Sequence, residues 1–469
     1  MGKDISRRSF IKAIGGGTVA AAPLLAACTD GRKKTSATQN EPQKGKMTYR
    51  TNPNTGDKVS LLGYGMMRLP VEGEGSGREN PDAPIDQDMV NREVDYAIEH
   101  GVNYFDTSPA YCRGLSERAT GIALSRHKRS DYFIATKMSN FAPETWTREA
   151  SMQMFENSLK ELQVDYVDYL LLHSIGQGSD ALGMFNSRYM DNGILDWLVE
   201  QKAKGRIRNI GFSYHGDVRI YDMLLKWHDE GRYHWDFVQI ELNYLDWNYA
   251  DEINSRNTDA VYLYGELKKR GIPAIIMEPL LGGRLVRVPD FVAAKMKERE
   301  PERSVASWAI RFAGSPDGVL TVLSGMTHME DLKDNLLSTA PLVPLTAEEN
   351  SFLMEIADDI YNLKTIPCNE CNYCMPCPYG IDIPGVLSHY NKCIADGNMP
   401  NRGAQDPDYR RERRAFLVGY DRSVPRLRQA SHCIGCGQCN EHCPQGIDIP
   451  KEMQRIDKFV EELKQNEPA

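Results

Sequence analysis

A repeated alternation of short apolar segments and longer amphipathic segments constrains the fold of this chain more than any other feature. Each apolar segment has the length of a strand, and its nearly continuous apolar character predicts burial on both faces, as in parallel sheets. The candidate strands are Val59–Gly63, Val102–Asp106, Tyr132–Lys137, Val167–His173, Ile207–Phe212, Phe237–Glu241, Ala274–Met277 and Val319–Leu323. Helical patterns follow them, such as Glu117–Ser125, Glu149–Leu162 and Gly193–Lys204. Eight such units predict the α/β class and a closed (β/α)8 TIM barrel. A doubly wound open sheet is the alternative, but no candidate strand is followed by GxGxxG, so a Rossmann fold has little support.

Two cysteine runs follow the barrel pattern. They are Cys368-x-x-Cys371-x-x-Cys374-x-x-Cys377-Pro378 and Cys433-x-x-Cys436-x-x-Cys439-x-x-x-Cys443-Pro444. Both runs are followed by the same Gly-Ile-Asp-Ile-Pro sequence, which indicates an internal duplication. Cys-Pro endings of this kind are typical of chains that hold two [4Fe–4S] clusters, in which the fourth Cys of each run crosses to the other cluster. This pattern assigns Cys368, Cys371, Cys374 and Cys443 to one cluster, and Cys433, Cys436, Cys439 and Cys377 to the other.

A pair of zinc sites is the alternative for these cysteines, because CxxC also suits tetrahedral Zn²⁺. The overlapping CxxC steps and the repeated Cys-Pro endings favour the iron–sulfur interpretation. The first run departs from the usual spacing, since it has two residues rather than three before its last Cys.

The N-terminus carries two sequence signals in the order that export requires. Ser6-Arg7-Arg8-Ser9-Phe10-Ile11-Lys12 resembles a twin-arginine signal, and Leu25-Ala26-Ala27-Cys28 resembles a lipoprotein cleavage site. The stretch between them is too short and glycine-rich for a stable membrane span. We therefore expect a signal at 1–27, a lipid on Cys28 and location in the periplasm or cell envelope. A disordered N-terminus with incidental arginines is the alternative.

The remaining chain divides into a flexible tether at 28–46, a barrel at 47–345 and a mainly α-helical iron–sulfur domain at 346–469. The tether is polar and rich in Lys, Pro and Gln. The net charge of −9 argues against a nucleic-acid partner. Of eleven cysteines, eight lie in the two runs and leave Cys28, Cys112 and Cys393, so we expect no disulfide framework despite the predicted export. The basic run Tyr409–Arg414 is expected to be a solvated helix face, and a docking patch for a redox partner is its alternative.

Three ionisable residues stand at the ends of consecutive candidate strands: Asp106, Lys137 and His173. That rim is where barrel enzymes keep their chemistry, and Tyr111 follows Asp106 closely. Each residue alone has a structural explanation: a helix cap, an ion pair or a satisfied core imidazole. Together they predict an active site.

These residues and the sequences around them resemble the aldo/keto reductase family from about Lys58 to Asn335. The matching sequences are Asn103-Tyr104-Phe105-Asp106-Thr107-Ser108-Pro109-Ala110-Tyr111, Ala135-Thr136-Lys137, Leu170-Leu171-Leu172-His173, Ile210-Gly211-Phe212-Ser213, Gln239-Ile240-Glu241-Leu242-Asn243-Tyr244, Glu278-Pro279-Leu280-Leu281-Gly282-Gly283 and Ser324-Gly325-Met326. With the cysteine runs, the chain looks like the subgroup with a ferredoxin-type C-terminal domain. The resemblance implies an oxidoreductase that interconverts a small-molecule carbonyl and an alcohol, with the tetrad Asp106, Tyr111, Lys137 and His173.

The tetrad's chemistry is consistent with that activity. Hydride transfer to a carbonyl carbon creates an alkoxide that must be protonated, and Tyr111 is the expected acid. We expect Lys137 to lower the pKa of Tyr111, Asp106 to hold Lys137, and His173 to donate a hydrogen bond to the oxyanion.

The resemblance also implies a nicotinamide cofactor, either NAD(H) or NADP(H). Ser213 and Gln239 would hold its carboxamide, with Tyr214 standing where many members have Asn. The remaining implied contacts are Pro279, Leu280, Gly282, Gly325, Asp331, Asp334 and Asn335. Gly325 and Asp331 replace the Lys and Arg of members that prefer the phosphorylated coenzyme, so NAD is favoured. Lys333 is the alternative cation for a 2′-phosphate, and Asp331 has a helix-dipole role as its alternative.

Three interpretations stay open. The first is an envelope-anchored oxidoreductase whose clusters exchange electrons with a redox partner. The second is a non-catalytic electron-transfer or binding lipoprotein with the barrel as scaffold. The third is a cytoplasmic reductase with idle twin arginines. Hydride and single-electron chemistry would need a coupling that no flavin motif supplies.

Overall fold

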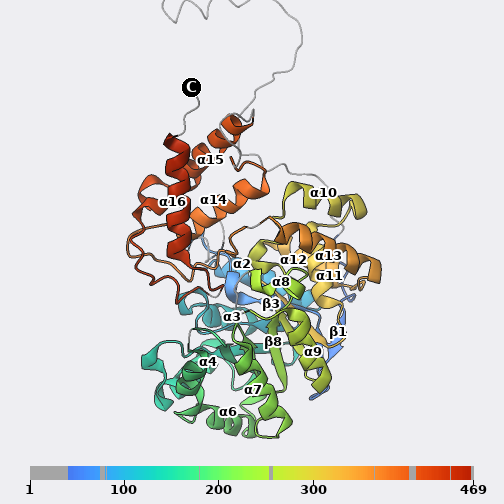
Figure 1. The fold of residues 1–469 in the computed structure, drawn as a ribbon. Coiled ribbons are helices and arrows are strands. Elements are labelled where there is room, and N and C mark those ends of the chain that lie inside the picture. Colours follow the sequence, from blue (N-terminus) through green and yellow to red (C-terminus); the bar gives the residue numbers. More distant parts are fainter. Residues whose placement is uncertain are drawn as a thin grey trace, which may run out of the picture. The chain divides into compact units, whose positions relative to one another are not determined.

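Eight parallel strands close into a barrel (Figure 1), which confirms the predicted (β/α)8 architecture. Each strand pairs with the next in sequence, and the last pairs with the first. The barrel strands are β3 (Leu62–Gly65), β4 (Tyr104–Asp106), β5 (Phe133–Met138), β6 (Val167–Ile175), β7 (Ile207–Tyr214), β8 (Phe237–Glu241), β9 (Ala274–Met277) and β10 (Val319–Ser324).

This computed structural model describes residues 41–73, 76, 80, 82–178, 180–252, 257–363, 365–400, 408–443 and 445–465. The predicted signal at 1–27 and the predicted lipidation site Cys28 lie outside these residues. Within them, no helix combines the length and the apolar character needed to cross a membrane.

The first predicted strand, Val59–Gly63, is two strands in the structure. β2 (Lys58–Ser60) pairs antiparallel with β1 (Tyr49–Thr51), and the barrel strand β3 begins only at Leu62. The Ser60 side chain explains the break, because its hydroxyl donates to the carbonyl of Leu62 at 2.7 Å. This local hydrogen bond competes with a continuous ladder.

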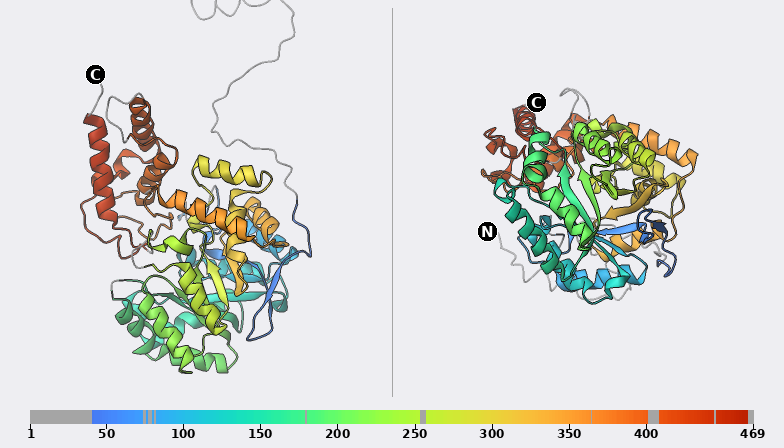
Figure 2. Two further views of the ribbon diagram at one scale, coloured as in Figure 1. Left: turned by 45° about the vertical axis from the view of Figure 1, so that its right-hand side comes forward. Right: turned by 90° about the horizontal axis from the view of Figure 1, so that it is seen from below.

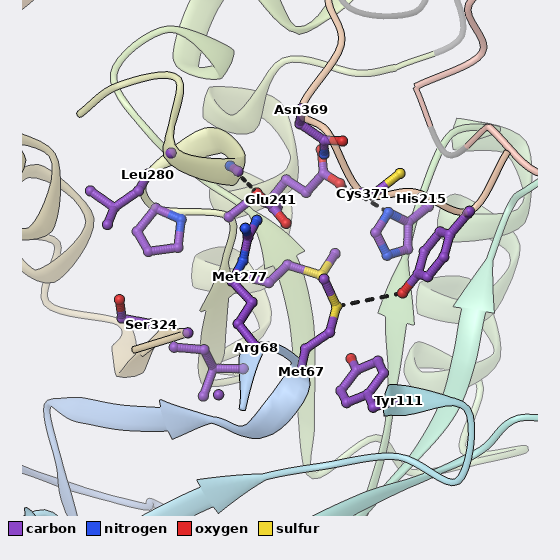
Figure 3. A pocket seen from close by; sticks show the side chains of 18 of the residues that line it. Met67, Arg68, Tyr111, His215, Glu241, Met277, Leu280, Ser324, Asn369 and Cys371 are labelled. Carbon is purple, nitrogen blue, oxygen red and sulfur yellow. Dashed lines mark hydrogen bonds and ion pairs between the residues drawn. The ribbon is translucent and has the colours of Figure 1, made fainter. Parts of the chain in front are cut away.

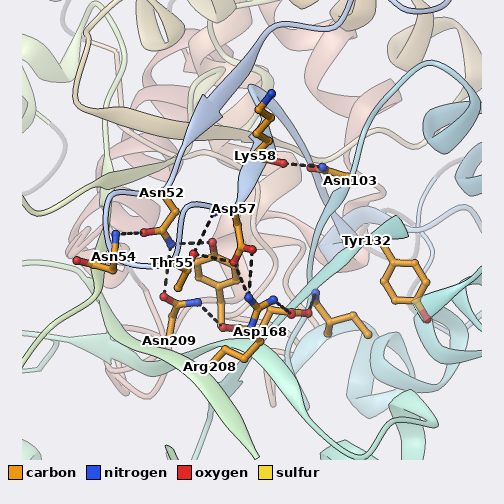
Figure 4. Close-up of polar contacts among 12 residues, drawn as sticks. Asn52, Asn54, Thr55, Asp57, Lys58, Asn103, Tyr132, Asp168, Arg208 and Asn209 are labelled. Carbon is orange, nitrogen blue, oxygen red and sulfur yellow. Dashed lines mark hydrogen bonds and ion pairs between the residues drawn. The ribbon is translucent and has the colours of Figure 1, made fainter. Parts of the chain in front are cut away.

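The β1–β2 hairpin and the loop between its strands contact one end of the barrel through polar side chains (Figure 4). Asn52 donates to the Tyr169 hydroxyl at 3.0 Å. Arg208 on β7 bridges Asp57 of the hairpin, at 2.9 Å, and the buried Asp168 of β6, at 3.1 Å. These bonds satisfy polar groups at the end of the barrel opposite the carboxyl ends of its strands.

Helices follow the strands around the outside of the barrel, as Figures 1 and 2 show. They are α2 (Gln87–Glu99), α3 (Ser116–Leu124), α4 (Arg148–Leu162), α5 (Ala181–Phe185), α6 (Ile194–Ala203), α7 (Val218–Asp229), α8 (Asp246–Tyr249), α9 (Ala260–Arg270), α10 (Asp290–Arg299), α11 (Val305–Gly314), α12 (Met329–Thr339) and α13 (Ala347–Tyr361). The ends follow local sequence: the Thr147 hydroxyl caps α4 by accepting from the N–H of Ala150, and Gln163 ends α4 in the left-handed conformation.

The interior of the barrel is packed with side chains. Tyr169 lies between Tyr104 and Phe237, with ring centroids 5.0 and 5.1 Å apart. A larger apolar core lies between the strands and the surrounding helices. The tightly packed interior gives the residues at the carboxyl ends of the strands a rigid base.

The barrel core extends beyond the predicted boundary at residue 345. Leu353, Ile356 and Ala357 of α13 are buried in the barrel core. The apolar face of α13 therefore belongs to the barrel, and the second core begins after it.

The C-terminal segment has its own core, and the regular elements that the structure describes in it are helices, which agrees with the prediction of a mainly α-helical domain. It contains α14 (Ile383–Ala395), α15 (Tyr409–Ser423) and α16 (Ile449–Gln465), whose buried residues include Val386, Phe416 and Met453. The basic run begins α15: Tyr409 and Glu412 are buried there, and Arg410, Arg411 and Arg414 are exposed. This agrees with the predicted solvated helix face.

Candidate active site

The four residues of the predicted tetrad meet at the carboxyl ends of β4, β5 and β6. Lys137 Nζ donates to Asp106 Oδ1 at 2.5 Å and to the carbonyl of Thr107 at 2.8 Å. The same ammonium lies 4.7 Å from the centroid of the Tyr111 ring. His173 stands edge-on to that ring, with centroids 5.9 Å apart.

Strand pairing explains why these side chains meet. Asp106 pairs with Ala135 on β5, and Lys137 pairs with Leu171 on β6. Lys137 lies two residues after Ala135, the partner of Asp106. His173 likewise lies two residues after Leu171, the partner of Lys137. A step of two keeps the side chain on the same face of the sheet.

Tyr111 is held by a turn rather than by a strand. Cys112 and Arg113, which follow it, both have left-handed backbones, with φ of 49° and 53°. Non-glycine residues in this region cost about 1–3 kcal/mol each and concentrate at functional sites. The Cys112 thiol donates toward the carbonyl of Met67 at 3.6 Å, and burial raises its pKa to about 11, so it is not a reactive thiolate.

Lys137 was expected to lower the pKa of Tyr111, but other influences on this pKa are larger. Burial raises the pKa of Tyr111 well above its ordinary value, and the negative charge of Asp106 raises it further. The reason is the ion pair: the Asp106 carboxylate, 2.5 Å from Lys137 Nζ, offsets most of the field of the lysine. Tyr111 is therefore a protonated phenol near neutral pH, which suits a proton donor.

His173 is a neutral imidazole. Burial lowers its pKa well below the ordinary value, and the charges of Lys137 and Arg188 lower it further. Its Nδ1 lies 2.6 Å from the Ser139 hydroxyl. When Ser139 donates to Nδ1, Nε2 carries the proton and can donate to an oxygen atom in the cavity.

A cavity of about 1200 Å³ opens above the tetrad (Figure 3). Asp106, Tyr111 and His173 line it, and Lys137 lies buried behind them. The cavity exceeds the range of about 300–1,000 Å³ that is usual for a single small-molecule ligand. It has room for a cofactor and a substrate together.

Most of the predicted nucleotide contacts line the same cavity. They are Gln239, Pro279, Leu280, Gly282, Gly325, Asp331, Asp334 and Asn335. Ser213 lies deeper, and its hydroxyl accepts from the N–H of Ser174 at 2.8 Å. Tyr214 donates to the carbonyl of Gly216, so it supports the loop that follows β7.

Gln239 provides the test of whether a nicotinamide fits. Its Nε2 donates to Met277 Sδ at 3.2 Å, and its Oε1 is buried without a hydrogen-bond partner. An unpaired buried acceptor costs about 1–3 kcal/mol. The amide N–H of a nicotinamide carboxamide would satisfy it, so the residues present fit this group.

At the side of the cavity that is expected to hold the adenine ribose, the cation is not the one that the sequence suggested. Gly325 packs against Arg68, since a Cβ at Gly325 would stand 2.9 Å from Arg68 Cδ. Arg68 lines the cavity and supplies a cation there. Lys333, the alternative cation, instead donates to Glu41 at 2.5 Å.

Asp331, Asp334 and Asn335 lie on α12. The Asp331 carboxylate accepts from the N–H of His328 at 3.3 Å and so caps the helix, which agrees with its structural alternative. Asp334 accepts from the Ser304 hydroxyl at 2.6 Å. Asn335 donates to the Ser324 hydroxyl at 2.9 Å, which ties α12 to the end of β10.

The predicted cluster ligands fall into two neighbourhoods. Burial raises the pKa of Cys368 to about 12, and the nearby Cys371 and Cys443 raise it further. Burial likewise raises the pKa of Cys439 to about 11, with Cys433, Cys436 and Cys377 as its close neighbours. Burial raises the pKa of Cys374, and the neighbouring Cys371, Cys368 and Cys443, together with Cys439 of the other assigned group, raise it further. The structure thus places the last cysteine of each run beside the other run.

These thiols fit an iron–sulfur group by their chemistry. The donors are all sulfur, and the N–H of Glu370 points to Cys368 Sγ at 3.4 Å, as N–H groups do around cluster sulfurs. Bound iron would deprotonate the thiols in spite of their burial.

Several residues of the cavity wall were not predicted from the sequence. His215 Nδ1 lies 2.9 Å from Glu241 Oε1 at the rim (Figure 3). Arg68 and Phe141 also line the cavity. These residues lie just after β3, β5 and β7 and at the end of β8. This position in the sequence could have identified them, because barrel sites are built from residues at the carboxyl ends of the strands.

Comparisons with known proteins agree with this geometry. A model of the aldo/keto reductase family matches residues 61–358, and a model of a 4Fe-4S dicluster domain matches residues 367–448. L-galactose dehydrogenase of Arabidopsis thaliana is 26% identical over 322 residues, which are 65% of this chain and 92% of that protein. Protein tas of Escherichia coli is 27% identical over 191 residues, which are 36% of this chain and 52% of that protein.

Two solved structures share the barrel fold. Aldo-keto reductase AKR11C1 from Bacillus halodurans (holo form) has a TM-score of 0.51 at 23% identity, over 66% of this chain and 96% of that one. An aldo-keto reductase from Klebsiella pneumoniae in complex with NADPH has a TM-score of 0.50 at 20% identity, again over 66% and 96%.

Proposed function

Since the chain belongs to the aldo/keto reductase family and is an oxidoreductase, we propose that it interconverts a carbonyl and an alcohol with a nicotinamide cofactor. One observation carries this proposal: the tetrad converges beneath a cavity that also contains an unpaired buried acceptor on Gln239. Bound nicotinamide supplies the hydride in reduction and accepts it in oxidation.

The residues of the chain then supply the proton and the electrostatics. Tyr111 holds a proton on its hydroxyl and delivers it to the oxygen atom of the carbonyl. His173 donates a hydrogen bond from Nε2 to the same oxygen. Lys137, fixed by Asp106 at 2.5 Å, lies beside the Tyr111 ring, and the paired charges leave Tyr111 a protonated phenol that can donate.

The non-phosphorylated coenzyme, NAD(H), remains the favoured one. Asp331 and Asp334 place carboxylates on α12 at the edge of the cavity, and Lys333 is engaged by Glu41. Arg68 is one of the cations of the cavity wall, with Arg287 and Lys297, and would contact a phosphate group of the dinucleotide. Tighter binding of NADPH than NADH would show that Arg68 serves a 2′-phosphate instead.

The substrate half of the cavity favours an uncharged ring. Phe141, Pro143 and Met184 give it an apolar wall, and the His215–Glu241 pair can exchange hydrogen bonds with hydroxyl groups. Similarity to L-galactose dehydrogenase supports a cyclic polyol, or its carbonyl form, as the substrate class.

The cysteine groups support two [4Fe–4S] clusters that pass electrons to or from a redox partner. The match to a dicluster domain over residues 367–448 supports this, as do the proximity of Cys443 to Cys368 and of Cys377 to Cys439. Iron and sulfide analysis giving about eight of each per chain would agree with two cubanes. Stoichiometric zinc without sulfide would refute them.

We further propose that the protein is exported and anchored in the cell envelope by a lipid on Cys28. The twin-arginine sequence and the Ala-Ala-Cys sequence support this location. Mass spectrometry of membrane-extracted protein should show a diacylated Cys28 peptide. An unmodified chain that retains Met1 would contradict both export and lipidation.

The enzymatic proposal is tested with two substrates and a matched variant. Holoprotein should oxidise L-galactose with NAD⁺ or reduce cyclohexanone with NADH, and Tyr111→Phe should lose at least about 100-fold in kcat while the visible absorbance of the clusters is unchanged. Tyr111→Phe with unchanged turnover would remove Tyr111 from the mechanism. A wild-type protein that binds neither nucleotide would favour the scaffold function.

A further inference from the structure

The wall of the catalytic cavity is shared between the barrel and the cysteine-rich segment. Both belong to one compact unit, Asn40–Ala469. The residues that the segment contributes are Asn369, Cys371, Tyr373, Glu441, His442 and Gln445. Figure 3 shows Asn369 and Cys371 around the same pocket as Tyr111 and His215. One of these six, Cys371, is a candidate cluster ligand.

Direct contacts fix the first cysteine run against the barrel. The Tyr373 hydroxyl donates to Met67 Sδ at 3.5 Å, and Met67 itself lines the cavity. Arg287 Nη2 lies 3.1 Å from Glu370 Oε1.

The backbones also approach closely, at the loop after β9. A Cβ at Gly282 would stand 2.5 Å from the carbonyl oxygen of Asn369. Gly282 has φ of +64°, so an L side chain there would be strained as well as obstructed. The loop that contains predicted nucleotide contacts thus lies directly against the first cysteine run.

The run presents Cys371 from a constrained backbone. Glu370 and Asn372, on either side of Cys371, both adopt left-handed conformations, with φ of 57° and 62°. Two left-handed non-glycine residues, one on each side of Cys371, cost about 1–3 kcal/mol each, so the fold maintains them against a local preference. Cys371 is a wall residue of the cavity and at the same time a close neighbour of Cys368.

Tyr373 reaches toward the catalytic acid. It lines the cavity together with Tyr111. A ligand whose oxygen contacts Tyr111 therefore has Tyr373 within the same enclosure.

We propose that the first cysteine run is the roof of the catalytic cavity. A ring-shaped, uncharged carbonyl ligand bound above Tyr111 contacts Tyr373, which acts as a specificity-determining residue, and lies beside the cluster that Cys371 ligates. This proposal rests on the proposed function and adds to it that occupancy of the cavity and the reduction potential of this cluster are coupled. The coupling is reciprocal: a ligand that prefers one redox state of the cluster shifts its potential by about 59 mV for each tenfold difference in affinity.

The first test uses cyclohexanone as probe and the wild-type holoprotein. Without nucleotide there is no turnover, so a redox titration followed by electron paramagnetic resonance reports binding alone. Saturating cyclohexanone should shift the midpoint potential of one cluster, and Cys371→Ser should remove the signal that shifts. Titrations that superimpose with and without the probe would overturn the coupling.

The second test uses a matched pair of tyrosines. Tyr373 belongs to the first run and Tyr379 directly follows it. They are 45% and 47% exposed, and of the two only Tyr373 is among the cavity-lining residues that the structure describes. Tyr373→Ala should weaken cyclohexanone binding at least fivefold, and Tyr379→Ala should leave it unchanged. Equal binding by both variants would overturn the role of Tyr373.

The two proposals fail in different ways. If wild-type protein reduces cyclohexanone with NADH but Tyr373→Ala matches Tyr379→Ala and no potential shifts, the roof is refuted and the proposed function stands. If wild-type protein oxidises L-galactose but does not bind cyclohexanone, the roof is refuted and the proposed function stands. If it acts on neither substrate, both are refuted. Iron content measured on each variant distinguishes loss of the cluster from loss of the contact.

Discussion

Breaking the buried pair between Asp106 and Lys137 should destabilise the barrel far more than replacing both residues. The two side chains are 4% and 0% exposed, and Nζ lies 2.5 Å from Oδ1. Burial lowers the pKa of Lys137, and Asp106 is the main group that opposes this shift. Removing Asp106 therefore leaves a buried ammonium without its counter-ion.

The expected magnitudes follow from this geometry. Asp106→Leu should cost about 3–5 kcal/mol of the free energy of unfolding, because an unpaired charge stays buried. Lys137→Met should cost a similar amount, since it also removes the donor to the Thr107 carbonyl, 2.8 Å away. The double variant should cost at most about 2 kcal/mol, since apolar pairs often replace buried ion pairs with little loss.

Tryptophan fluorescence during urea unfolding isolates the barrel in this measurement. The six tryptophans all lie in the barrel, at Trp146, Trp197, Trp227, Trp235, Trp247 and Trp308. The coupling energy is the double-variant cost minus the two single costs. Additive costs, with a coupling below about 0.5 kcal/mol, would refute the view that the two charges depend on each other.

Three further predictions concern burial, protonation and packing. Burial raises the pKa of Glu93, which accepts from the Tyr64 hydroxyl, to about 8. The folded protein therefore keeps this proton at pH values above the unfolded pKa near 4.5, so the free energy of unfolding should fall by on the order of 3–5 kcal/mol as pH rises from about 4.5 to 8. Glu93→Gln should remove this pH dependence in urea titrations. Because the pKa of Tyr111 is raised, cyclohexanone reduction should be flat with pH near neutrality and alcohol oxidation should increase up to pH 10 and above; a decrease of oxidation over that range would contradict the assignment. Gly282→Ala should disturb the contact with Asn369 and increase amide hydrogen exchange in the first cysteine run. Unchanged exchange would show that the backbone adjusts to the added methyl group without loosening the run.

The sequence predicted the barrel and the tetrad because their signals are local. Asp106, Lys137 and His173 each lie at the end of an apolar strand, and strand ends of a parallel barrel meet at one rim. The strand boundary near Ser60 was not predictable in the same way, because it depends on a hydrogen bond from its own side chain against a continuing apolar pattern. The helix Ala347–Tyr361 was assigned to the iron–sulfur domain, but its apolar face packs on the barrel. An amphipathic pattern predicts that a helix face is buried but does not say which domain covers it.

Other features depend on contacts between distant parts of the chain. The pKa of Tyr111 follows from burial and from the balance of the Asp106 and Lys137 charges, which only the folded site shows. Arg68 reaches the cavity because Gly325 leaves room for it, and these two residues are far apart in sequence. The position of Tyr373 beside Met67 is likewise a long-range contact.

Transfer of deuterium from C4-deuterated NADH to cyclohexanone tests the central claim most directly. The tetrad and the nicotinamide should act on one carbonyl group, so mass spectrometry of the cyclohexanol should show deuterium at the carbinol carbon when wild-type holoprotein is used, and Tyr111→Phe should yield almost no product. Cyclohexanol that carries solvent hydrogen at that carbon, or a product formed equally well by Tyr111→Phe, would contradict hydride transfer at this site.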